Sequence, residues 1–174
     1  KPQLSDQYAV GYFKNFKNRT YSLEVEAYYK TVDNRIDYID GSDLIGQNTI
    51  ETEILNGESR SYGLEILFRK ALGNFTGWIA YTASKAEQRT LGGNAGGPGI
   101  NNGDWYNAVQ DRTHDVSIIG SYQLNPKWSF GAAFVYQTGR PVTYPNGQYE
   151  YEGLSIANYS ERNADRLPSY HRFD

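Results

Sequence analysis

Apolar and polar residues alternate along positions 114 to 139, HDVSIIGSYQLNPKWSFGAAFVYQTG. Every second residue on either side of Asn125-Pro126-Lys127 belongs to one series that carries no charge. That series comprises Val116, Ile118, Gly120, Tyr122, Leu124, Trp128, Phe130, Ala132, Phe134 and Tyr136. Because successive side chains of a strand point to opposite faces, the pattern predicts two strands that share one apolar and one wet face.

The same period of two recurs along most of the chain, and no convincing helical stripe of apolar residues interrupts it. The candidate strands cover residues 5–16, 20–32, 59–70, 75–89, 113–124 and 128–139, with a seventh that begins near Ser169. The sequence therefore predicts an all-β fold: an antiparallel up-and-down sheet of about six strands and the start of a seventh.

The connections between these strands alternate between short and long. The segments 17–19, 71–74 and 125–127 have the composition of tight hairpin turns, whereas 33–58, 90–112 and 140–168 are long. In an up-and-down sheet, every second connection lies at the same edge. All short turns are thus expected at one edge and all long loops at the other, as in outer-membrane barrels.

The length of the strands and the placement of aromatic residues favour lipid over water as the environment of the apolar face. A soluble β-sandwich also alternates, but its strands have ~5–6 residues, whereas a tilted membrane strand needs ~9–11. Aromatic residues make up 15% of a chain whose mean hydropathy is only -0.69. On the apolar series they flank the short turns or lie farther along, as a membrane girdle would. We therefore predict a segment of a transmembrane β-barrel.

Charge on this apolar series is expected only near strand ends. The cations that we assign to it are Lys14, Arg60 and Lys70, which can extend to the membrane surface. The opposite, lumen-facing series carries a candidate polar network. Its members are Glu24, Glu26, Glu65, Arg69 and Asp115. We expect this network to brace a structure inside the barrel or neighbouring strands rather than to bind cargo.

Composition excludes several classes of function. The net charge is -3 and the cations are scattered, so nucleic acid is not an expected partner. Cysteine is absent, which excludes disulfides and thiolate metal sites. His114 and His171 are the only histidines, and HExxH and GxSxG motifs are absent. We predict no enzymatic activity, no catalytic residue and no cofactor.

The long loops hold two kinds of candidate site. Asp37, Asp40 and Asp43 in the first loop form a weak calcium candidate, since their spacing lacks the EF-hand pattern; a solvated acidic loop is the alternative. Six aromatic residues of the later loops are candidates for ligand contact. They are Trp105, Tyr106, Tyr144, Tyr149, Tyr151 and Tyr159. The alternative is that these rings only pack on one another.

Five short segments, in this order, resemble the C-terminal barrel region of TonB-dependent outer-membrane receptors, most closely those of Bacteroidetes. They are YGLEI from Tyr62, GWIAYT from Gly77, DRTHD from Asp111, TGRP from Thr138 and RLPSYHRFD from Arg166. The resemblance covers most of the chain, and the segments from Asp111 and Arg166 are the most specific.

The resemblance implies a receptor of the bacterial outer membrane, embedded in lipid, that imports an iron chelate, a vitamin or a glycan. Such receptors have a 22-stranded barrel and an N-terminal plug, take energy from TonB, and in some cases pair with a surface lipoprotein. Six strands cannot close that barrel, so residues 1–174 are expected to be a fragment without the plug, the TonB-contacting region and the remaining strands. The alternatives are a passive porin or small barrel adhesin, and a soluble β-rich carbohydrate-binding module.

Overall fold

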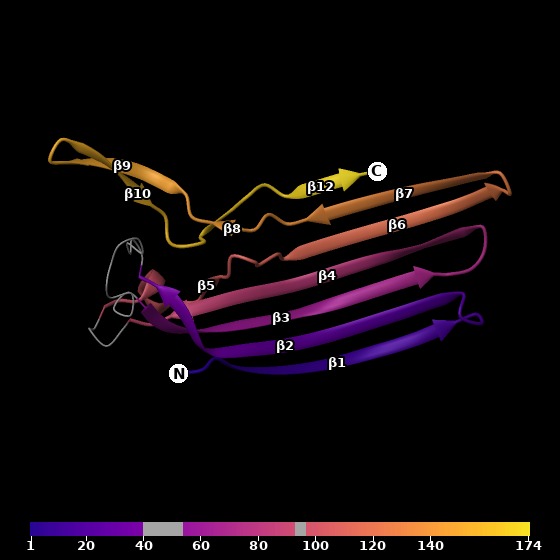
Figure 1. Cartoon of the computed structure of the whole chain (residues 1–174), viewed down its shortest axis with the longest axis horizontal. Coiled ribbons are helices and arrows are strands. Elements are labelled where there is room, and N and C mark those ends of the chain that lie inside the picture. The colour runs from indigo at the N-terminus through magenta and orange to yellow at the C-terminus, as the bar shows by residue number, and fades with distance from the viewer. Residues whose placement is uncertain (40–53, 93–96) are drawn as a thin grey trace.

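One antiparallel sheet dominates the structure, a computed structural model that describes residues 1–39, 54–92 and 97–174 (Figure 1). Its strand order is β1-β2-β3-β4-β6-β7-β12, so neighbours in space are neighbours along the chain. The strands are β1 (Leu4–Phe16), β2 (Tyr21–Tyr38), β3 (Ile54–Lys70), β4 (Phe75–Thr90), β6 (His114–Asn125), β7 (Trp128–Gln137) and β12 (Tyr170–Phe173). A short strand β5 (Tyr106–Asn107) also pairs with β4. The all-β, up-and-down prediction is confirmed, and the sheet stays open across the described residues.

The three short turns lie at one edge of the sheet and the long connections at the other (Figure 1). Lys17, Asn18 and Arg19 have positive φ in the first turn, and Gly73 has φ 101° in the second. In the third, the side-chain oxygen of Asn125 accepts hydrogen bonds from the backbone amides of Lys127, at 2.9 Å, and Trp128, at 3.1 Å. This edge geometry is the one that the alternating connection lengths predict.

The first long loop is shorter than the sequence indicates, because β2 and β3 extend into it. We expected loop from position 33 to position 58, but strand continues to Tyr38 and resumes at Ile54. A β-bulge made the extension hard to detect. The pairing shifts between Val32 and Arg35, with Asn34 at φ 57°. One extra residue reverses the faces beyond it, so the period of two breaks at that point.

The last long loop contains strands that the sequence analysis did not predict. A hairpin of β9 (Pro145–Tyr151) and β10 (Leu154–Tyr159) projects beyond the sheet (Figure 1). At its base β8 (Pro141–Val142) pairs with β11 (Asp165–Arg166). In the second loop a helical turn, η2 (Ile100–Gly103), precedes β5. No helix in the described ranges has the length and hydropathy needed to cross a bilayer.

The strands bury few side chains. The buried residues gather at the loop edge, which is the end of the sheet where the long connections join the strands. Large apolar residues of the predicted lipid face are exposed along the sheet, with Val10 at 72%. The buried hydrophobic cluster consists instead of Leu55, Ile100 and Tyr106. Such a sheet needs another phase against each face, which fits a wall between lipid and a lumen.

Charge on the apolar series is more extensive than the sequence analysis indicated. Lys85, Glu87 and Arg89 follow Tyr81 on the same face of β4, and Glu87 lies directly opposite Arg60 of β3. Lys85 lies directly opposite Tyr62, and Arg60, Glu87 and Arg89 lie on the loop side of that pair. The apolar band therefore ends at these tyrosines, as expected where a lipid face meets the external aqueous phase.

Candidate functional site at the loop edge

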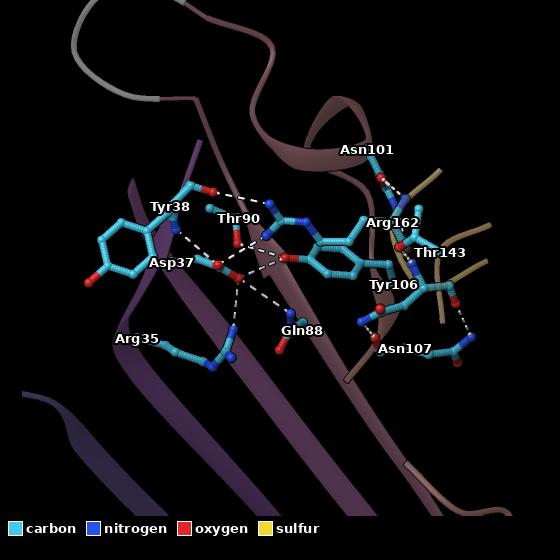
Figure 2. A network of polar contacts seen from close by, with 11 residues as sticks. Arg35, Asp37, Tyr38, Gln88, Thr90, Asn101, Tyr106, Asn107, Thr143 and Arg162 are labelled. Carbon is cyan, nitrogen blue, oxygen red and sulfur yellow. Dashed lines mark hydrogen bonds and ion pairs between the residues drawn. The ribbon is translucent and has the colours of Figure 1, made fainter. Parts of the chain in front are cut away.

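Asp37 is the centre of a polar network that joins the first, second and last long loops (Figure 2). The β2 bulge places it on the inner face, opposite Leu55. Its carboxylate accepts hydrogen bonds from Arg35 Nη1 at 3.2 Å, Gln88 Nε2 at 3.4 Å, Tyr106 Oη at 3.2 Å and Arg162 Nη1 at 3.0 Å. Two guanidinium groups, those of Arg35 and Arg162, offset the charge of this carboxylate.

Tyr106 fills the middle of the network (Figure 2). The residue is 6% exposed, and its hydroxyl lies 3.1 Å from the hydroxyl of the fully buried Thr90. Burial raises the pKa of the Tyr106 phenol above its ordinary value, although the hydrogen bond with Thr90 acts in the opposite direction. The neutral phenol is therefore the form that the network stabilises.

The last loop is attached to the second through paired amide contacts (Figure 2). Asn101 donates to the carbonyl of Arg162 at 3.0 Å and accepts from its amide at 2.9 Å. Asn107 and Asn163 each donate a side-chain N–H to the other's carbonyl, at 3.2 and 2.7 Å. The base of the β9–β10 hairpin is thus fixed to the sheet by contacts between residues far apart in sequence.

A second brace joins the last loop to β4. The side chain of Asp111 is 0% exposed; it accepts the Ala86 amide at 2.6 Å and forms an ion pair with Arg166. The other arm of Arg166 donates to the carbonyl of Gly139 at 3.0 Å. Both residues lie in the two segments that carry the most specific part of the family resemblance, but their pairing was not predicted.

Trp105 lies against two guanidinium groups on the outer face. Its ring centroid is 4.2 Å from Cζ of Arg60 and 5.0 Å from Cζ of Arg89. Each arginine also forms an ion pair, Arg60 with Glu87 at 2.8 Å and Arg89 with Glu58 at 3.0 Å. The half-buried ring packs on sheet residues rather than projecting from the loop.

Two tyrosines of the last loop, Tyr149 and Tyr151, lie on one face of the β9–β10 hairpin, where they pair with Ile156 and Leu154. Tyr159 follows a register shift and lies opposite Pro145, and Tyr144 directly precedes β9. Tyr149 is 53% exposed and Tyr159 is 60% exposed.

The structure divides the six predicted ligand-contact residues into two groups. Tyr106 is buried in the Asp37 network and offers no ring surface to a ligand in this conformation. Trp105 packs on Arg60 and Arg89. Tyr144, Tyr149, Tyr151 and Tyr159 are exposed, and their contact with a ligand stays a prediction.

The predicted lumen residues share one face but do not form a connected network. Glu26 lies directly opposite Glu65, and the row continues through Thr82 to Asp115. Within the described part of the chain, no hydrogen bond or ion pair joins any two of Glu24, Glu26, Glu65, Arg69 and Asp115. Asp115 instead accepts from Gln137 Nε2 at 2.7 Å. Two directly opposed glutamates are destabilising unless a cation approaches from the lumen.

The calcium candidate lies only partly within the described residues. Asp37 is occupied by the guanidinium contacts described above, whereas Asp40 and Asp43 lie outside the described residues. Over the described ranges, no group of three or more acidic or histidine side chains has the arrangement of a metal site. His114 Nδ1 lies 2.9 Å from the Tyr81 hydroxyl on the outer face.

The open wall, its exposed apolar face and the elaborate loops at one edge define a β-barrel protein of the outer membrane. The family model described as "TonB dependent receptor-like, beta-barrel" matches residues 1–174. The chain therefore belongs to the TonB-dependent receptor β-barrel family and is located in the bacterial outer membrane. Neither the curated proteins nor the solved structures include a match.

Proposed function

We propose that this chain forms part of the barrel of a receptor that actively imports a scarce ligand, such as an iron chelate, a vitamin or a glycan. The observation that carries the proposal is the family match along the entire chain. The family consists of receptors and transporters, not enzymes. In this proposal the loop edge captures the ligand, and the inner face lines its path.

The arrangement of the loop edge supports capture by positioned loops. The Asp37 network and the Asp111–Arg166 pair fix the base of the β9–β10 hairpin to the sheet. A fixed base orients the exposed tyrosines of the hairpin, so less conformational entropy is lost when a ligand binds. Tyr144, Tyr149, Tyr151 and Tyr159 are the proposed contacts, with aromatic rings that suit sugars or aromatic chelates.

The acidic inner face supports a filled rather than an empty lumen. Glu26 and Glu65 are directly opposed, and Glu24 is on the same side of β2. Cationic side chains of a plug would offset this charge, and the plug would carry the contact with TonB that the family implies. The remaining strands would close the barrel, and a surface lipoprotein is a further proposed partner.

Uptake by cells that express the intact receptor tests this function. Ferric siderophores, cobalamin and oligosaccharides, each radiolabelled, are offered to cells with and without TonB. We expect accumulation of one class, and its loss when TonB is deleted. If proteoliposomes with the intact protein pass small sugars freely and without energy, the intact protein acts as a passive pore and the proposal is wrong.

A further inference from the structure

A cavity of about 390 Å³ lies where β7 and β12 meet the base of the last loop. Arg112, Gln137, Arg140 and Tyr170 supply its polar groups, and Leu167 and Pro168 supply apolar wall. Gln137 and Tyr170 are register partners on the inner face of the sheet, the face of Asp115. A volume of this size accommodates a small ligand.

The lining of this cavity is positively charged, whereas the chain as a whole is negatively charged. The protein has a net charge of -3, yet the lining of this cavity contains two arginines and no aspartate or glutamate. Arg112 donates to Gln137 Oε1, and the Gln137 amide donates in turn to Asp115. That relay uses one N–H of Arg112 and leaves its other donors for a ligand.

Arg140 is the second cation of the cavity. It is exposed, and within the described residues neither an ion pair nor a hydrogen bond engages its guanidinium group. The other extracellular arginines described above, at positions 35, 60, 89, 162 and 166, all have carboxylate partners. A planar guanidinium binds carboxylate or phosphate through two parallel hydrogen bonds.

The backbone around Arg140 is held in place. A Cβ at Gly139 would lie 1.6 Å from the Leu167 carbonyl oxygen, so only glycine allows this close approach. The Leu167 amide donates to the Arg140 carbonyl at 3.0 Å. Arg166, which is paired with buried Asp111, donates to the Gly139 carbonyl. The loop segment that carries Arg140 is therefore fixed before any ligand arrives.

We propose that this cavity binds an anionic group, a carboxylate or a phosphate, of the imported ligand. Arg140 forms the main contact, Arg112 the second, and the Tyr170 hydroxyl a further donor. The inference rests on the proposed function, because a ligand reaches the inner face only if it enters the barrel. It also narrows that function to cargo with at least one negatively charged group.

Calorimetry on the intact, detergent-solubilised receptor tests the cavity directly, with citrate and inorganic phosphate as probes. We expect one of the two anions to bind the wild type, and R140Q to raise its Kd about tenfold or more. R140K retains the charge but not the planar guanidinium group with its paired donors, so its Kd is expected to lie between those of the wild type and R140Q. R19Q, in the β1–β2 turn at the opposite edge, is the matched control and should bind as the wild type does.

The inference is wrong if neither anion binds the wild type, or if R140Q and R19Q bind as tightly as the wild type does. TonB-dependent uptake, measured separately, tells this failure from failure of the proposed function. Uptake that persists alongside a failed calorimetric test overturns only the anion site. Uptake that does not depend on TonB overturns the proposed function itself.

Discussion

The sheet and the loop edge are stabilised in opposite ways. Along the sheet, long ladders of backbone hydrogen bonds join strands whose apolar side chains are exposed. At the loop edge the ladders end, and polar side chains such as the half-buried Asp37 and the buried Thr90 and Asp111 connect segments far apart in sequence. The sheet thus depends on its surroundings, whereas the loop edge has an interior of its own.

This contrast shows where sequence determines structure locally and where it does not. A strand with a lipid face tolerates any apolar residue of suitable size at most positions, because the lipid adapts to the side chain. A buried ion pair tolerates little, because removal of one partner leaves an uncompensated charge or an unsatisfied donor. Point substitutions at the loop edge are therefore expected to act on particular contacts, and those in the sheet on the match with lipid.

The largest effect is expected when Asp111 is replaced by alanine. The buried carboxylate accepts the Ala86 amide and pairs with Arg166, so its loss leaves both donors unsatisfied. Arg166 is 27% exposed, which allows partial rehydration, and we expect a local loss of about 3 kcal/mol. Hydrogen exchange at the Ala86 and Leu167 amides of the intact receptor measures it. Unchanged protection at both amides would show that the brace contributes nothing.

An arginine in place of Leu64 tests the lipid assignment of the sheet. Leu64 lies on the apolar series between Tyr62 and Phe68, and an arginine at mid-membrane costs ~2–4 kcal/mol. Leu67→Arg is the matched control, because Leu67 points to the predicted lumen face three residues along the same strand. Urea titration of folding into lipid vesicles compares the two. Equal losses for both variants would contradict the division into lipid and lumen faces.

A smaller effect is expected for Asp37→Asn. The substitution keeps the shape of the side chain but removes the charge that faces Arg35 and Arg162. Hydrogen bonds to charged groups contribute ~1.5–3 kcal/mol, so the hairpin base should open more readily by about that amount. Hydrogen exchange at the Arg162 amide, which donates to Asn101 Oδ1, reports the opening. Asp33→Asn, at an exposed position just before the bulge, is the control, and a similar response from it would count against a specific role of Asp37.

The fold was predictable because its main signal is local. Alternation along strands such as 59–70 and 128–139 gave their faces, and the turn residues gave the edge at which they reverse. The prediction failed where alternation failed. The bulge at Asn34 reversed the pattern, so the end of β2 was interpreted as loop. The β9–β10 hairpin was missed since its strands are short, with seven and six residues.

The site was much less predictable, for a different physical reason. Asp37 and Arg162 are 125 positions apart, and no local pattern links them. Tyr106 and Tyr149 were given the same role from composition, yet one is buried and the other exposed. The difference in burial follows from the pairing of β5, which contains Tyr106, with β4. A strand of two residues produces almost no recognisable pattern in the sequence.

The smallest expected effect is a dependence of the stability of the loop edge on alkaline pH, which distinguishes the loop edge from the sheet. The pKa of Tyr106 is raised above its ordinary value of about 10, chiefly by burial, so unfolding lowers it. The stability that this group contributes is thus complete below pH 10. As the pH rises from the pKa of the unfolded state toward the higher pKa of the folded state, this contribution decreases by up to about 1.4 kcal/mol for each pH unit.

Tyr106→Phe isolates this effect, because it removes the titrating hydroxyl and little else. Below pH 10 the wild type should be the more stable by about 1 kcal/mol, through the contacts of the hydroxyl with Asp37 and Thr90. The advantage should decrease as the pH rises above 10, measured as the difference in local stability from Trp105 fluorescence during urea titration. A constant difference across that range would mean that the Tyr106 hydroxyl stays accessible to water, and that the loop edge has no dry interior.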